Sequence, residues 1–225
     1  MKQRLFATLS LAGFAMATFG ATKPKTAIKS LNKTTIQQPT YTEWHDLQVN
    51  AINRFPLHTN FFTYPADDWV YEKDGKIVSK DILHMNKTES KYFLSLDGTW
   101  KFNWVANADQ RPTDFYKEDL DDSKWKTMNL PGIWEMNGFG DPEYVNVGFG
   151  WRGHFDQQPP AVPTKDNHVG SYRRIIDIPA NWDGKQVVAH FGSVTSNIYL
   201  YVNGKFAGYA EDSKVAAEFD ITPYL

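Results

Sequence analysis

The sequence predicts an all-β protein, a β-sandwich of the jelly-roll type. Apolar and polar residues alternate with a period of two in several short segments, as in strands with one buried face. Glycine, proline, asparagine and aspartate separate these segments, and none of them keeps a helical period. The connections are long and irregular, which favours a jelly roll over a simple meander. At 225 residues the chain can bury a substantial core.

The first clear strand is expected after the turn signal Asp97-Gly98. Trp100, Phe102 and Trp104 then alternate with polar residues, which places three bulky rings on one face, where we expect them in the core. Later segments show the same alternation or short apolar runs bounded by turn residues. They predict strands near 172–178, 187–191, 198–202, 206–209 and 217–221.

The strongest local signal is the dipeptide Asn203-Gly204 between two of these segments. Both residues tolerate the positive φ angles of a two-residue hairpin turn, so 198–202 and 206–209 should form a hairpin. Between 198 and 202, three aliphatic residues face one side, and Tyr199 and Tyr201 face the other.

The first 21 residues have the pattern of a secretory signal peptide. Lys2 and Arg4 precede an apolar run that is too short to span a bilayer comfortably. The small residues Gly20 and Ala21 follow the run, as at a signal-peptide cleavage site. We expect residues 1–21 to lie outside the fold, a buried first helix being the alternative. Residues 22–42 then form a polar linker, and the protein is expected in a bacterial periplasm or secreted, with no membrane span after cleavage.

The composition excludes several functional classes. Lysine and arginine number 24 against 26 aspartate and glutamate, so the chain lacks the basic excess of a nucleic-acid binder. The absence of cysteine excludes disulfides, thiol catalysis and zinc–thiolate sites. The aromatic content of 15% suits a β-sandwich, and it also suits a protein that stacks rings on sugars.

The connection between residues 130 and 171 is too long and too rich in aromatics for a plain loop. Such loops are usually functional or interfacial, and Trp134 and Trp151 are its candidates for stacking on a sugar or a neighbouring domain. The acidic residues between 118 and 122 are interpreted as solvated loop charges. The six histidines are scattered, which argues against a metal site, and His190 in an apolar strand is expected to be structural.

Several motifs occur in order: LDGTWKF at 96–102, LPGIWEMNGF at 130–139, PEYVNV at 142–147, PPAVPT at 159–164, GSY at 170–172, YVNGKFAGY at 201–209, EDS at 211–213 and EFDI at 218–221. Over roughly residues 43–225 the sequence resembles the N-terminal sugar-binding domain of β-galactosidases in glycoside hydrolase family 2. The resemblance implies a galactose-binding-domain-like jelly roll at 90–225, preceded by an extended arm at 43–89. In that family the domain continues with further strands, so we expect the domain to be C-terminally truncated here.

The resemblance also implies the activity of the complete enzyme. It would be an exported β-galactosidase that hydrolyses terminal β-D-galactosides with retention, which needs two carboxylates about 5–5.5 Å apart. In the resembled family these lie on a later barrel domain that is absent here, so this chain holds no catalytic residue and is expected to be inactive alone. A related β-glucuronidase or β-mannosidase, or a non-catalytic carbohydrate-binding module, are the alternatives.

Three residues match the family's substrate contacts. Asn146 and Asp212 are implied to bind the galactosyl ring, with Val147 lining the same pocket, and Asp212 is implied to be one ligand of a Na⁺ ion. Mg²⁺ ligands would lie on the missing barrel. A turn asparagine at 146, and an Asx turn or N-cap of Asp212 with Ser213, remain open. The implied partners are a β-galactoside, the missing C-terminal domains and, at full length, further copies in a homo-oligomer.

Overall fold

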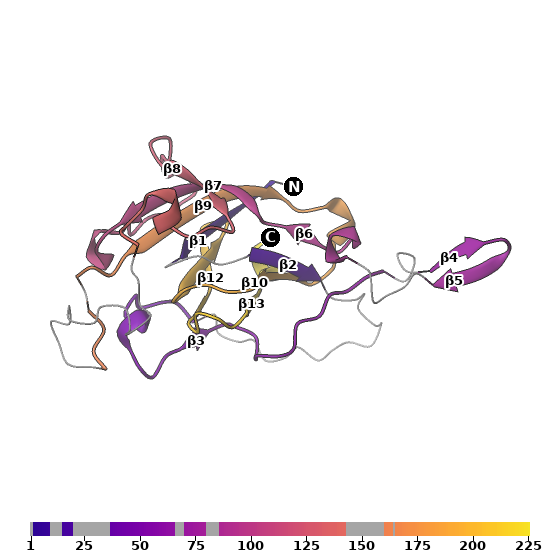
Figure 1. Cartoon of the computed structure of the whole chain (residues 1–225), viewed down its shortest axis with the longest axis horizontal. Helices are drawn as coiled ribbons and strands as arrows, with labels where there is room; N and C mark the ends of the chain where they lie inside the picture. Colours follow the sequence, from indigo (N-terminus) through magenta and orange to yellow (C-terminus); the bar gives the residue numbers. More distant parts are fainter. Residues whose placement is uncertain are drawn as a thin grey trace.

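The computed structural model of the chain is built almost entirely of antiparallel strands (Figure 1). It describes residues 2–9, 15–19, 37–65, 70–79, 86–142, 160–163 and 165–225. The strands are β1 Lys2–Leu9, β2 Ala15–Phe19, β3 Ala51–Ile52, β4 Val70–Lys73, β5 Lys76–Ser79, β6 Leu94–Ser95, β7 Gly98–Val105, β8 Lys126–Leu130, β9 Val169–Asp177, β10 Val187–Phe191, β11 Ile198–Val202, β12 Lys205–Ala210 and β13 Ala217–Asp220.

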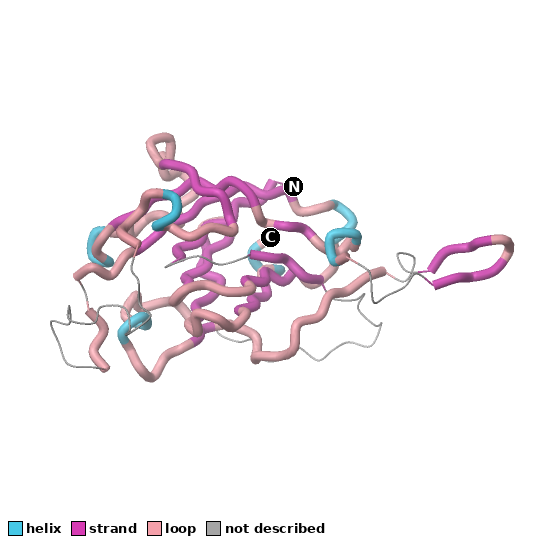
Figure 2. The backbone as a smooth tube through the Cα atoms, in the orientation of Figure 1, coloured by secondary structure: helices cyan, strands magenta, loops and turns pink. Residues whose placement is uncertain are grey.

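Helical structure among the described residues is limited to single 3₁₀ turns in the connections (Figure 2). Within the part of the chain that the structure describes, no helix is both long and apolar enough to cross a membrane. The turns are η1 Glu43–His45, η3 Lys87–Glu89, η4 Ala108–Gln110, η5 Glu135–Asn137, η6 Ala180–Trp182 and η7 Thr222–Tyr224.

Two sheets form the body of the molecule. The larger has seven strands in the order β3-β12-β11-β1-β9-β7-β8, and the smaller has four in the order β13-β10-β2-β6. Buried residues of both sheets form one hydrophobic cluster, so the sheets pack face to face. The predicted all-β sandwich is therefore confirmed, whereas its jelly-roll connectivity stays a prediction.

The interior between the sheets is filled by large rings. Trp100 and Phe102 of β7 are each 1% exposed, which confirms that the alternating strand places them in the core. Trp104, the third ring of that strand, is only partly buried. The two sheets lie close together at Gly208 of β12, where an added Cβ atom would lie 2.4 Å from the ring of Phe219 in β13. Only glycine fits there without displacing its neighbours.

The expected hairpin over 198–209 is present as β11 and β12. Asn203 and Gly204 have φ angles of 48° and 73°, the left-handed pair that the dipeptide predicts. The aliphatic residues of β11 face the interior between the sheets, while Tyr199 and Tyr201 belong to a second cluster on the outer face. The strand is buried on both faces, which explains why it has no polar side.

The start of the arm at 43–89 covers that outer face. Ile52 of β3 pairs with Tyr209 of β12 and packs in the second cluster, and the buried Glu43 accepts a hydrogen bond of 2.8 Å from the Tyr199 hydroxyl. Further along, β4 and β5 form a separate hairpin that projects from the body (Figure 1). Asp74 and Gly75, with φ angles of 53° and 70°, form its turn.

The structure differs from the expectation that residues 1–21 lie outside the fold. Strand β1 lies between β9 and β11, with Leu5 opposite both Arg174 and Val202, and β2 lies between β10 and β6. The physical reason is that short apolar and small residues with no helical face suit buried strands as well as a signal sequence. Removal of this segment by a signal peptidase stays a prediction, and most of the linker at 22–42 lies outside the described residues.

Candidate functional site

Asp212, the predicted sugar and Na⁺ ligand, lies two residues after the end of β12. Its φ angle of 82° is left-handed, and its carbonyl oxygen accepts a hydrogen bond of 2.9 Å from the Val215 amide. The preceding Glu211 donates its amide to the Asn50 carbonyl oxygen of the arm at 3.0 Å. The arm and a tight turn together therefore fix the backbone that carries this carboxylate.

The carboxylate itself is held by Arg54 of the arm. The Arg54 Nη1 atom lies 3.2 Å from Asp212 Oδ2, and it also donates to the Glu211 carbonyl oxygen at 3.4 Å. The Arg54 side chain is 11% exposed and that of Asp212 is 44% exposed, so a buried guanidinium orients a carboxylate that still reaches solvent. Among the described residues the Asp212 side chain accepts no hydrogen bond from its own turn, so the Asx-turn alternative is not what the structure shows.

A second carboxyl lies beside Asp212. Burial raises the pKa of Glu211, a hydrogen bond of 2.6 Å from the Tyr209 hydroxyl opposes this, and the charge of Asp212 raises it further. The net effect raises the pKa of Glu211, so this group takes up a proton more readily than an ordinary glutamate. The two neighbouring carboxyls therefore differ in environment.

A hollow of about 960 Å³ opens beside these groups. Three carboxylic acids, two asparagines and two serines supply polar groups, and an indole supplies an apolar plane. Such a set suits a polyhydroxylated ring, because the carboxylates accept hydrogen bonds from hydroxyls while an aromatic face packs on C–H groups. It is lined by Trp44, His45, Asp46, Leu47, Val162, Asn167, Ser196, Asn197, Glu211, Asp212 and Ser213.

Of the predicted site residues, only Asp212 can be placed. Asn146 and Val147 lie outside the described residues, so the structure does not test whether they approach it. In the described part of the chain no three His, Asp or Glu side chains gather as a metal site, and Na⁺ binding by Asp212 stays a prediction. Arg54 and Trp44 were not predicted as parts of this site. Both belong to the arm predicted at 43–89.

Other residues singled out in the sequence have structural roles. Asp122 binds Arg173 at 2.9 Å, and the structural assignment of His190 is confirmed by its 2.7 Å contact with Glu218. The prediction that Trp134 stacks on a ligand or a neighbouring domain is wrong, because its side chain is 0% exposed and donates its indole N–H to the Tyr172 hydroxyl in the core. Trp151 lies outside the described residues.

Comparison with known proteins gives a consistent family. Residues 93–225 match the model for "Glycosyl hydrolases family 2, sugar binding domain". The chain is 37% identical over 179 residues to a β-galactosidase of Halalkalibacterium halodurans, covering 80% of this chain and 16% of that protein. It is 34% identical over 186 residues to a β-galactosidase of Priestia megaterium (82% and 17%). It is 35% identical over 192 residues to a β-galactosidase large subunit of Leuconostoc lactis (80% and 28%). The chain thus spans less than a third of each relative.

Proposed function

Because the chain belongs to glycosyl hydrolase family 2 and carries the sugar-binding domain of that family over residues 93–225, we propose that it is the substrate-contacting part of an exported β-galactosidase. The complete enzyme would hydrolyse terminal β-D-galactosides with retention of configuration. The observation that supports this most directly is the hollow beside Asp212. The carboxylate held by Arg54 and the indole of Trp44 both line this hollow. A β-glucuronide carries a carboxylate of its own, and the acidic lining of this hollow disfavours it.

In this proposal Asp212 binds and orients the sugar and moves no proton. Arg54 fixes the direction of the carboxylate, so Asp212 accepts hydrogen bonds from ring hydroxyls. Asn146 would contact the same ring through its amide, and Val147 would line the pocket. The two catalytic carboxylates of a retaining enzyme would come from a barrel domain elsewhere in the polypeptide.

The proposed Na⁺ fits the chemistry of Asp212. Its Oδ2 atom is bound by Arg54, while Oδ1 has no partner among the described residues and offers a hard oxygen ligand. The bound cation would supply positive charge that orients sugar oxygens. The Mg²⁺ ligands, like the remaining Na⁺ ligands, would lie on the barrel domain, and the full-length enzyme would form a homo-oligomer.

Export through residues 1–21 to the periplasm or the medium is a separate part of the proposal. It rests on the basic and apolar pattern of the segment. Cleavage would also remove β1 and β2, so export by cleavage and the pairing of these strands in the mature protein are alternatives. N-terminal sequencing of the protein recovered from the producing cells tests it. A start near residue 22 supports export, and a start at residue 1 contradicts it.

The activity is tested on the enzyme from the complete reading frame that contains this chain. We expect hydrolysis of nitrophenyl β-galactoside and little hydrolysis of the corresponding glucuronide or mannoside. Asp212→Asn should lower kcat/KM by about two decades and weaken the response to Na⁺ measured against K⁺ at constant ionic strength. Asp119→Asn, at an exposed aspartate outside the hollow, is the matched control. Binding of galactosides without hydrolysis would indicate the non-catalytic module instead.

A further inference from the structure

A second hollow adjoins the one beside Asp212, and its volume is about 490 Å³ when the space open to solvent is included. We call it the aromatic pocket. The two hollows have Trp44, Asn167 and Asn197 as common walls. Unlike its neighbour, the aromatic pocket has no aspartate or glutamate among the described residues of its lining, and most of its wall is apolar. It is lined by Tyr41, Trp44, Ala108, Arg111, Phe115, Asn167, His168, Val169, Asn197 and Tyr199.

The aromatic walls are held in fixed positions by their own contacts. Trp44 donates its indole N–H to the Tyr41 carbonyl oxygen at 3.1 Å, and the rings of Tyr41 and Tyr199 lie 5.6 Å apart. Phe115 is only 3% exposed, and it packs edge-on against Tyr201 beneath the pocket wall. Rings that are fixed before a ligand arrives lose little conformational freedom on binding, so a flat apolar ring fits here at low entropic cost.

Arg111 is a cation in the lining of this pocket, and none of the described carboxylates is its counter-ion. It is partly buried, its Nη1 atom donates to the Ala108 carbonyl oxygen at 2.7 Å, and its guanidinium lies 5.7 Å from the centre of the Tyr41 ring. Within the described residues no carboxylate forms an ion pair with it. Glu43, the buried acid of this region, is instead bound by the Tyr199 hydroxyl at 2.8 Å. A partly desolvated cation that has a carbonyl and a ring as its contacts, but no described counter-ion, favours an anionic ligand.

We propose that the aromatic pocket binds an aromatic ring that carries a carboxylate. The ring would lie between the aromatic walls, and the remaining N–H groups of Arg111 would donate to the carboxylate in the paired geometry that guanidinium favours. The Asp212 hollow would reject the same ligand, because its three carboxylic acids repel a negative charge. The proposal concerns binding alone and does not depend on the galactosidase activity.

The direct test is isothermal titration of the 225-residue chain with three small probes. Benzoate has both the ring and the charge, benzyl alcohol has the ring alone, and acetate has the charge alone. We expect benzoate to bind with a dissociation constant on the order of 1 mM, the range for a ligand of this size. Benzyl alcohol and acetate should bind at least tenfold more weakly. Equal affinity for benzoate and benzyl alcohol would overturn the role of Arg111.

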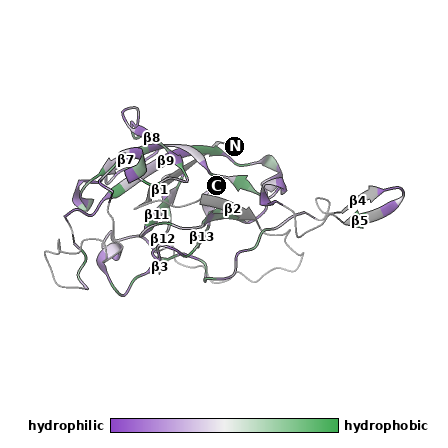
Figure 3. Cartoon of the chain, viewed as in Figure 1, coloured by the Kyte–Doolittle hydropathy of each residue, from purple (hydrophilic) through white to green (hydrophobic). Residues whose placement is uncertain are grey.

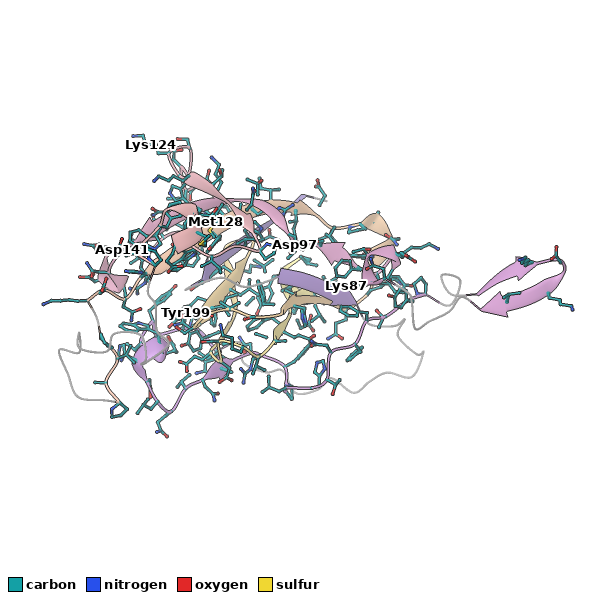
Figure 4. All side chains as sticks on the ribbon, viewed as in Figure 1. Lys87, Asp97, Lys124, Met128, Asp141 and Tyr199 are labelled. Carbon is teal, nitrogen blue, oxygen red and sulfur yellow. The ribbon has the colours of Figure 1, made fainter. Side chains whose placement is uncertain are left out.

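Two variants separate the charge from the ring. Arg111→Gln should weaken benzoate binding about tenfold and leave benzyl alcohol binding unchanged. Ala108→Leu should weaken both probes, because Ala108 lines the pocket and a larger side chain would fill it. Lys124→Gln is the matched control for the lost positive charge, since Lys124 lies at the tip of the β7–β8 connection, away from Tyr199 (Figure 4). The residues at that tip are hydrophilic (Figure 3).

The probe must also be shown to occupy this pocket. Benzoate should change the intrinsic tryptophan fluorescence, and Trp44→Phe should remove most of that change without abolishing the heat of binding. A melting curve for each variant identifies loss of folding, and the proton NMR shifts of benzoate give a second measure of binding. If Arg111→Gln and Ala108→Leu both stay folded and bind benzoate as the wild type does, the proposal is wrong.

Discussion

Deleting residues 1–21 should cost the isolated chain most of its stability. Strand β1 has five registered residue pairs with β11 and eight with β9, so its loss opens the middle of the seven-stranded sheet. A strand hydrogen bond contributes about 0.5–1.5 kcal/mol net, and roughly a dozen of them are comparable to a total stability of ~5–15 kcal/mol. Residues that are 0% exposed beside the gap, such as Ser171 and Tyr172 of β9 and Leu200 of β11, would then lie at open edges.

The assay is urea unfolding followed by far-ultraviolet circular dichroism, with size-exclusion chromatography to detect association. We expect the shortened chain to lose its cooperative transition and to associate. The control replaces 70–79 by a short Gly/Ser linker, because within the described residues β4 and β5 pair only with each other. If the chain without residues 1–21 unfolds at the wild-type midpoint, β1 contributes nothing and the reasoning from its pairing is refuted.

Three further predictions concern stability. Gly208→Ala should lower the free energy of unfolding by about 1–3 kcal/mol, because its Cβ atom would also lie 2.8 Å from a backbone oxygen; an unchanged urea midpoint would contradict this. Asn203→Ala should cost about 1–2 kcal/mol in the same assay, since it removes a 2.7 Å hydrogen bond at a residue with φ of 48°. Glu218→Gln should lower Tm by roughly 3 °C, most strongly between pH 4.5 and 6.5. A hydrogen bond from His190 lowers the pKa of Glu218, so the stability that the Glu218 carboxylate contributes is lost as pH falls below 4.5. Hydrogen bonds to the Thr59 carbonyl oxygen and to Glu218 raise the pKa of His58, so the stability from the His58–Glu218 pair is lost as pH rises above 6.5. A Tm difference that does not change with pH would refute this account.

The parts of the fold that could be predicted are those specified by neighbouring residues. The hairpin of β11 and β12 follows from Asn203-Gly204, and the burial of Trp100 and Phe102 follows from a period of two. Strands β1 and β2 could not be predicted in this way. Their partners lie more than 150 positions later in the chain, apart from β6, and no local pattern reports a pairing over that distance.

The candidate site was only partly predictable for the same reason. Asp212 was found through its motif, but its ion pair joins residues 158 positions apart, so Arg54 could not be assigned to it. Trp134 was predicted to be available to a ligand because its connection is long. The structure instead shows that the Trp134 indole is buried and donates a hydrogen bond to the Tyr172 hydroxyl. The turn Glu135–Asn137 follows it directly. Arg111 had no distinguishing sequence pattern. Its importance comes from the surrounding rings and from the lack of an ion pair with any described carboxylate.

The wall shared by the two hollows has a thermodynamic consequence. Trp44 faces both, and its indole is anchored by one hydrogen bond of 3.1 Å to the Tyr41 carbonyl oxygen. A ligand that displaces the indole from either side must break that bond, at a cost of about 1 kcal/mol, or roughly a fivefold change in affinity. Linkage requires this factor to be the same in both directions. Only a ligand that displaces the indole would couple the two hollows in this way, and a ligand that leaves the Trp44 ring in place would leave the affinity of the other hollow unchanged.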